Sequence, residues 1–150
     1  MYKRILVATD GSKTSQLALE EALRLAQGGQ TRLRLVHVID SPYGYADAWY
    51  AAVAADLEAI QRAWRRAGQD ILAQAATVAR EAGVEVETAL LETDGRRVSR
   101  AIVDEADRWG AEVIVIGSHG RQGLEHLLLG SVAEGVVRTA RVPVLLVRGQ

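Results

Sequence analysis

Short apolar runs alternate with long amphipathic stretches along this chain, and no other feature constrains its fold as strongly. The apolar runs are Ile5–Thr9, Leu33–Ile39, Val84–Leu91, Val113–Ile116 and Val144–Val147. Strands that are separated by helices favour a mostly parallel sheet with helices covering both of its faces. We therefore predict an α/β fold, a three-layer domain built on an open, five-stranded sheet.

Length and composition favour one domain over residues 1–150. With 49% hydrophobic and 25% charged residues, the chain has enough apolar side chains to bury a core without disulfides or metals. It has no cysteine, which excludes a thiolate metal site and a cysteine nucleophile. The first apolar run is too short for a signal peptide or a membrane span, so we expect a soluble, cytoplasmic protein. The net charge of −1, without a basic stripe, argues against nucleic acid as a partner.

Three of the amphipathic stretches are predicted to form helices. The first is predicted to end at Gly28, where glycine is a common helix terminator. The alanine-rich stretch Asp47–Ala82 predicts one long helix, with Gly68 as a weak point in its middle. A further helix is predicted to run as far as Trp109 from Asp94, which has the side chain of an N-cap.

A glycine-bearing loop joins the fourth apolar run to the last helix. It contains Gly117 and Gly120 and, after nine further residues, Gly130 and Ser131. Glycine lets a ligand come close to backbone amides, and Ser131 with Glu134 has the spacing of a capping box. The helix that follows would point its unpaired N–H groups at an anion such as a polyphosphate. The same residues also fit a role limited to turn formation and capping, and spacing does not separate the two interpretations.

A second polar loop, from Thr9 to Ser12, follows the first strand. Ligands of open α/β sheets bind beyond the carboxyl ends of the strands, where the winding direction reverses. The two loops flank that position if the first and fourth strands are neighbours. Asp10 is then placed to hold Mg²⁺ that is shared with phosphates. Asp10 also fits a role in orienting the turn, and the two roles can coexist.

These segments together resemble the universal stress protein family over the whole chain. The resemblance is carried by Ile5–Ser12, Val36–Asp40, the loop Gly117–Ser131 and the ending Val142–Val147. The spacing of the loop glycines is similar to that of the ATP-binding branch of this family: two residues separate Gly117 from Gly120, and nine separate Gly120 from Gly130 and Ser131. The resemblance implies a Rossmann-like domain with strand order 3-2-1-4-5 that binds ATP.

The resemblance also implies a set of nucleotide-site residues. Val38 would bind adenine through its backbone, and Asp10 would hold Mg²⁺. Ser131 and Val132 would bind phosphates, and the glycines would lie against ribose and phosphates. The full set is Ala8, Thr9, Asp10, Val38, Ile116, Gly117, Gly120, Gly130, Ser131 and Val132. Ala8 departs from the proline that some members of the family carry.

A homodimer that forms through the last strand is a further implication of the resemblance. The sequence agrees with it, because Val144–Val147 is a flat apolar strand that would associate if its edge were open. The chain has no Walker lysine pattern, and its histidines His37, His119 and His126 are scattered. No residue is therefore a clear base for activating water.

We accordingly predict a homodimeric stress-response regulator that binds an adenine nucleotide and has little or no ATPase activity. Nucleotide would order the loop from Gly120 to Gly130 and so change a surface that faces an unidentified protein partner. The alternatives are a nucleotide-hydrolysing or nucleotidyl-transferring enzyme on the same scaffold, and a dimeric scaffold without a ligand.

Overall fold

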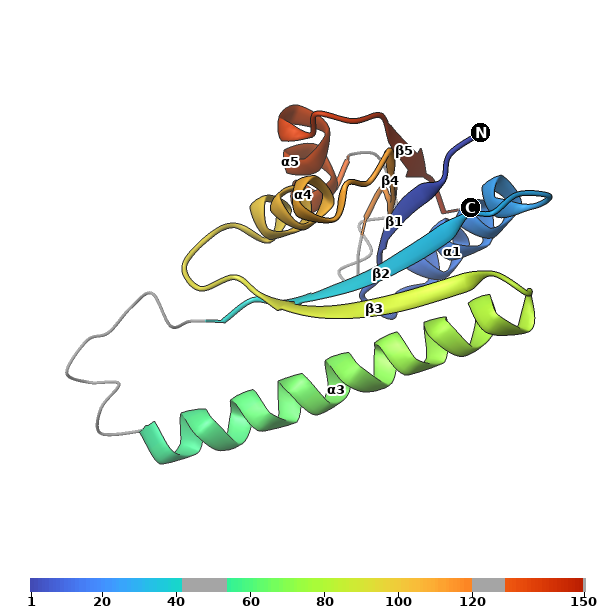
Figure 1. The fold of residues 1–150 in the computed structure, drawn as a ribbon. Coiled ribbons are helices and arrows are strands. Elements are labelled where there is room, and N and C mark those ends of the chain that lie inside the picture. The colour runs from blue at the N-terminus through green and yellow to red at the C-terminus, as the bar shows by residue number, and fades with distance from the viewer. Residues whose placement is uncertain (42–53, 120–128, 150) are drawn as a thin grey trace.

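A five-stranded sheet with order β3-β2-β1-β4-β5 organises the computed structural model, which describes residues 1–41, 54–119 and 129–149 (Figure 1). Every strand pairing is parallel. The predicted α/β class and strand order are therefore confirmed. The elements are β1 Arg4–Ala8, α1 Lys13–Ala26, β2 Arg32–Ile39, α3 Ala54–Glu81, β3 Glu85–Glu92, α4 Val98–Trp109, β4 Val113–Gly117, α5 Ser131–Thr139 and β5 Val144–Val147.

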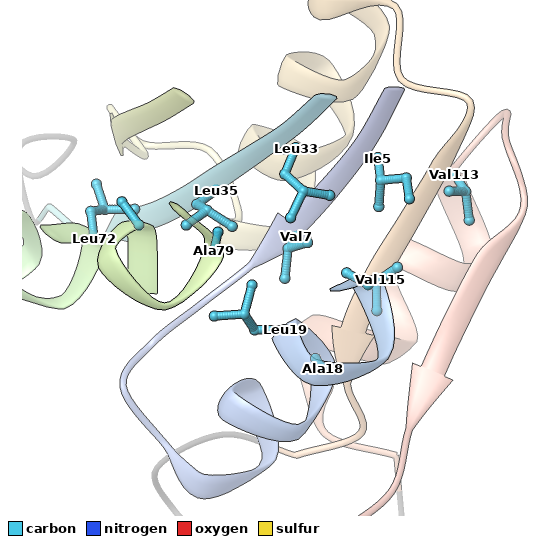
Figure 2. Packing of buried hydrophobic residues seen from close by; sticks show 12 residues of the cluster. Ile5, Val7, Ala18, Leu19, Leu33, Leu35, Leu72, Ala79, Val113 and Val115 are labelled. Atoms are coloured by element: carbon cyan, nitrogen blue, oxygen red, sulfur yellow. The ribbon is translucent and has the colours of Figure 1, made fainter. Parts of the chain in front are cut away.

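The sheet separates two apolar cores, one on each face. On one face, α1 and α3 pack on the sheet through a cluster that includes Ile5, Val7, Leu19, Leu35 and Leu72 (Figure 2). On the other face, α4 and α5 cover a cluster that includes Leu6, Val36, Ile102, Ile114 and Val136. Strands buried on both sides need apolar residues at successive positions, which explains the uninterrupted runs in the sequence.

The predicted long helix is α3, and it runs along β2 and β3 (Figure 1). Residues 47–53 of the prediction lie outside the described residues. The helix continues through Gly68, which is buried, so the predicted weak point is not a break. Gly68 instead marks a close approach of α3 to the sheet. Within the described ranges, no helix combines the length and the apolar character needed to cross a membrane.

The predicted start of α4 at Asp94 is wrong. The helix begins at Val98, and its N-cap is Arg97, whose side chain makes no capping hydrogen bond. Asp94 has a φ of 49°, and the N–H of Arg96 donates to the carbonyl of Thr93 at 2.9 Å. Aspartate tolerates the left-handed region better than most residues, so it serves here in a turn after β3.

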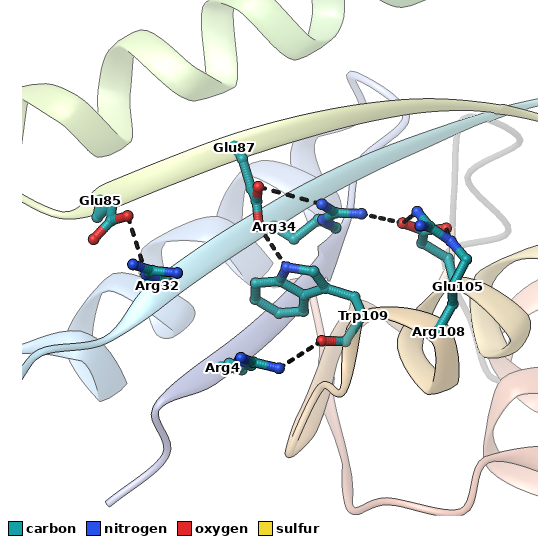
Figure 3. Close-up of polar contacts among 8 residues, drawn as sticks. All are labelled: Arg4, Arg32, Arg34, Glu85, Glu87, Glu105, Arg108 and Trp109. Carbon is teal, nitrogen blue, oxygen red and sulfur yellow. Dashed lines mark hydrogen bonds and ion pairs between the residues drawn. The ribbon is translucent and has the colours of Figure 1, made fainter.

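A polar network centred on Trp109 lies at the amino ends of the strands, on the α4 face (Figure 3). The indole ring lies 6.0 Å from the guanidinium carbon of Arg4 and 5.3 Å from that of Arg34, and its N–H donates to Glu87. Arg34 pairs with Glu87 at 3.2 Å and also with Glu105. Burial raises the pKa of Glu87, but hydrogen bonds from Arg34 and Trp109 and the nearby positive charges outweigh that effect, so this pKa lies below its ordinary value. The network ties three strands to the C-terminal end of α4.

Candidate functional site

The winding direction of the sheet reverses between β1 and β4. Helix α1 leads from β1 to β2 on one side, whereas α4 leads back across to β4 on the other side. Ile5 to Val7 pair directly with Val113 to Val115. The loops that follow β1 and β4 therefore leave the sheet next to each other at its carboxyl end. Open α/β sheets bind their ligands at this position.

The loop after β1 is a compact turn that begins α1. Ser12 is the N-cap of α1, and its hydroxyl accepts a hydrogen bond from the N–H of Ser15 at 3.2 Å. The N–H of Ser12 donates in turn to Oδ1 of Asp10 at 2.8 Å. The structure thus shows the turn-orienting role that was one of the two interpretations of Asp10.

Thr14 joins this turn to the loop after β4. Its hydroxyl donates to the carbonyl of His119 at 2.5 Å. A Cβ atom on Gly117 would lie 3.0 Å from Cβ of Thr14, so the two segments are in close contact. The sequence interpretation did not single out Thr14. The available signal was the cluster of hydroxyl residues around Asp10, which suits turns and loop contacts.

The start of α5 differs from the predicted capping box. Ser131 is the first helical residue, and the N-cap is Gly130, which offers no side-chain hydrogen bond. The N–H of Glu134 donates to the carbonyl of Gly130 at 2.9 Å, while the Glu134 carboxylate pairs with Arg138. The N–H of Gly130 donates to the carbonyl of Ser118 at 2.6 Å. The first turn of α5 therefore lies beside β4 without a capping side chain, and its N–H groups suit an anion.

The backbone of Val38 faces the place where β1 separates from β2. The last backbone bond between these strands joins the N–H of Thr9 to the carbonyl of Val36 at 2.8 Å. Alternate residues of a parallel strand bond to opposite neighbours, and the carbonyl of Ile39 faces β3, where it accepts from Thr93. The N–H and C=O of Val38 therefore face β1, where they have no backbone partner among the described residues. An adjacent donor and acceptor suit the polar edge of a planar base.

The predicted site residues come from four segments that meet at the carboxyl end of the sheet. Gly120 lies outside the described residues. Ala8, Thr9 and Ile116 are buried, whereas Ser131 is exposed. The segments are the end of β1 with Ala8, Thr9 and Asp10, β2 with Val38, the end of β4 with Ile116 and Gly117, and the start of α5 with Gly130, Ser131 and Val132.

The fold and the position of these loops define the class of protein, an open parallel α/β domain of the Rossmann-like type. The model of the universal stress protein family matches residues 1–148, and the chain belongs to this family. It is 35% identical to the universal stress protein MJ0531 of Methanocaldococcus jannaschii, over 99% of this chain and 83% of the relative. It is 33% identical to YxiE of Bacillus subtilis, over 99% of this chain and 100% of the relative. The family predicted from the sequence is confirmed.

Solved structures show the same fold, and they include complexes with adenine nucleotides. Protein MJ0577 superimposes with a TM-score of 0.85 and 27% identity, over 100% of this chain and 98% of that one. The universal stress protein of Archaeoglobus fulgidus in complex with dAMP has a TM-score of 0.67 and 26% identity, with 97% and 98% of the chains covered. A universal stress protein in complex with cAMP has a TM-score of 0.66 and 26% identity, with 98% and 97% covered.

Proposed function

We propose that this chain is a nucleotide-dependent regulatory protein. It binds adenine nucleotides, including ATP, and hydrolyses them slowly or not at all. The observation that carries this proposal is the backbone of Val38, which faces the separation of β1 and β2 and has no backbone partner within residues 1–41, 54–119 and 129–149. The uncapped start of α5 lies at the same end of the sheet. One ligand with a hydrogen-bonding base and an anionic tail suits both features. The complexes of related proteins with dAMP and cAMP support this choice of ligand.

The nucleotide would extend from β2 across the end of β1 to α5. Adenine would bind the N–H and C=O of Val38, and the ribose would lie against Ile116 and Gly117. The phosphates would approach Gly120 and Gly130 and would accept hydrogen bonds from Ser131 and Val132. The close contact of Gly117 with Thr14 and of Gly130 with Ser118 leaves no room for larger side chains there.

Asp10 is the residue that would hold Mg²⁺. Magnesium prefers carboxylate oxygens, keeps several of its waters and is commonly shared with substrate phosphates, which suits one aspartate beside a polyphosphate. Because Oδ1 of Asp10 accepts from Ser12, the Asp10→Asn variant keeps an oxygen for this turn while losing the charge. The variant therefore separates the metal role from the turn role.

Calorimetric titration with ATP, with and without Mg²⁺, tests the proposed function. We expect a dissociation constant in the micromolar range or below, about −8 kcal/mol or better, and tighter binding with Mg²⁺. Asp10→Asn should remove the effect of Mg²⁺, whereas Asp70→Asn, on the exposed side of α3, should keep it. The absence of ATP binding would contradict the proposal. The nucleotide should be recovered uncleaved, and release of ADP, AMP or pyrophosphate would favour the enzymatic alternative.

We also propose that the chain forms a homodimer through β5. This strand is at the edge of the sheet and pairs on one side with β4, and the side chain of Leu145 is 37% exposed. Open apolar edges favour association with another strand. Leu145→Lys should raise the dimer dissociation constant about tenfold or more, because like charges would face each other across the paired edges.

Sedimentation velocity measures this effect directly. Val137→Lys is the matched control, since Val137 is an exposed apolar residue that belongs to α5 and not to the edge strand. The control variant should remain a dimer at the concentration at which Leu145→Lys is a monomer. A dimer that survives Leu145→Lys unchanged would place the interface elsewhere. The proposed nucleotide-dependent ordering of the loop from Gly120 to Gly130 falls largely outside the described residues and stays a prediction.

A further inference from the structure

His37 reaches the nucleotide site from the face of the sheet that α3 covers. Its side chain is half-buried, and Nδ1 lies 2.8 Å from the carbonyl oxygen of Thr9. A carbonyl oxygen only accepts hydrogen bonds, so the facing ring nitrogen carries the proton and donates. The imidazole thus binds the backbone immediately before Asp10.

This side-chain hydrogen bond replaces the next bond of the sheet. If the ladder between β1 and β2 continued past Val36, the N–H of Val38 would donate to the carbonyl of Thr9. In the structure this oxygen accepts from the imidazole of His37 and not from the N–H of Val38. Side-chain donors that bind neighbouring backbone groups compete with regular secondary structure, and here the ladder ends at this point. The N–H of Val38 is left without a partner on β1.

Gly68 of α3 makes room for the imidazole. A Cβ atom at this position would lie 2.8 Å from Cδ2 of His37 and 2.7 Å from Cδ1 of Leu90. Any other residue would therefore press on the ring. Glycine within a helix costs about 1 kcal/mol relative to alanine. The close approach to His37 gives a physical reason for glycine in the middle of α3.

We propose that His37 is a positioning residue for the nucleotide. By holding the carbonyl of Thr9, it keeps β1 apart from β2 and leaves the N–H of Val38 for an acceptor on the ligand's base. This inference rests on the proposed function, because a base is the partner that the Val38 backbone would receive. Its structural part, the state of the Val38 amide, is independent of any ligand.

Three variants separate hydrogen bonding from packing. His37→Leu fills the space without a donor, so Val38 can bond to Thr9. His37→Asn has a side-chain amide N–H at the same number of bonds from the backbone as Nδ1 of histidine. This variant should keep the hydrogen bond to the carbonyl of Thr9 and so behave as the wild type. His37→Gln has the same amide one bond further out, where it faces Gly68, and it carries the test if the leucine variant does not fold.

Two measurements decide the role of His37. Amide hydrogen exchange at Val38, followed by NMR without nucleotide, should be about tenfold or more slower in the Leu and Gln variants than in the wild type. Their affinity for AMP should fall about tenfold or more, which is about 1.4 kcal/mol, while binding of inorganic tripolyphosphate stays unchanged. The Asn variant should match the wild type in both measurements. Tripolyphosphate controls for the phosphate-binding part of the site.

Unchanged Val38 exchange in the Leu and Gln variants would overturn the inference. Equal losses of AMP affinity in the Asn and Leu variants would also overturn it, because the effect would then come from packing of the ring. If the wild-type chain binds no AMP, the proposed function fails. The exchange rates would still show whether His37 keeps the strands apart.

Discussion

Gly130→Val is expected to lower the affinity for AMP and ATP about 100-fold or more, a loss of about 2.8 kcal/mol. A Cβ atom on Gly130 would lie 3.1 Å from the carbonyl oxygen of Ser118 and 3.3 Å from Cα of His119. Valine would therefore push the start of α5 away from β4 and would occupy the space into which phosphates must come. The buried residues Ala133 and Val136 keep α5 packed on the sheet, so the fold should survive.

Calorimetry with AMP and ATP measures this loss of affinity. Two further variants serve as a smaller change at the same position and as a control elsewhere on α5. Gly130→Ala adds the Cβ atom alone and should cost about tenfold in affinity, because the neighbouring backbone must yield by a few tenths of an ångström. Thr139→Val places a valine at the exposed end of the same helix and should leave binding unchanged. Thermal unfolding without nucleotide shows whether each variant is folded. A folded Gly130→Val variant with wild-type affinity would contradict the proposed placement of the phosphates.

Glu105→Ala is expected to lower the free energy of unfolding by about 3–5 kcal/mol, the usual cost of removing one partner from a buried ion pair. The side chain of Glu105 is 5% exposed and that of its partner Arg34 is 15% exposed. Nε of Arg34 is already buried, and it has no hydrogen-bond partner in the part of the chain that the structure describes. Loss of Glu105 would leave the guanidinium with a further unmet donor and with the more exposed Glu87 as its remaining carboxylate partner among the described residues. Since domains are stable by about 5–15 kcal/mol, this is a large fraction of the total.

Urea denaturation of Glu105→Ala and of two comparison variants tests whether the loss of stability comes from the buried ion pair. Arg34→Met combined with Glu105→Leu should recover most of the stability, because apolar side chains of similar volume often replace a buried ion pair without loss. Glu134→Ala, in an exposed pair with Arg138, should cost less than about 1 kcal/mol. A cost at Glu105 as small as that at Glu134 would mean that the pair is effectively solvated. Nucleotide affinity of the folded variants should stay unchanged, since the network lies at the opposite end of the strands.

The strands were predictable because burial on both faces demands unbroken apolar runs. The predicted Val113–Ile116 and the observed β4, Val113–Gly117, differ by one residue. Helix starts were less predictable, because side-chain type alone does not choose between a cap and a turn. Asp94 belongs to a turn before α4, and Gly130 takes the N-cap position that was assigned to Ser131.

The positions of the site loops followed from the strand order, but the contacts between them did not. Thr14 and His119 are 105 residues apart in the chain, and His37 and Thr9 are 28 apart. Neither pair has a local pattern that predicts its contact. The local sequence around a histidine in a strand does not predict whether its ring contacts apolar side chains or a backbone carbonyl. Such roles emerge only from the packing of α1 and α3 on the sheet.

The central place of β1 has a consequence for how the chain is made. During synthesis β1 can pair early with β2, but its other partner, β4, leaves the ribosome only about 100 residues later. Ile5, Leu6 and Val7 are fully buried in the finished protein, so the nascent chain carries an open apolar edge for most of its synthesis. Pairing over such a long separation is slow to form. Shielding of that edge by a ribosome-associated chaperone would protect the growing chain from wrong strand pairing.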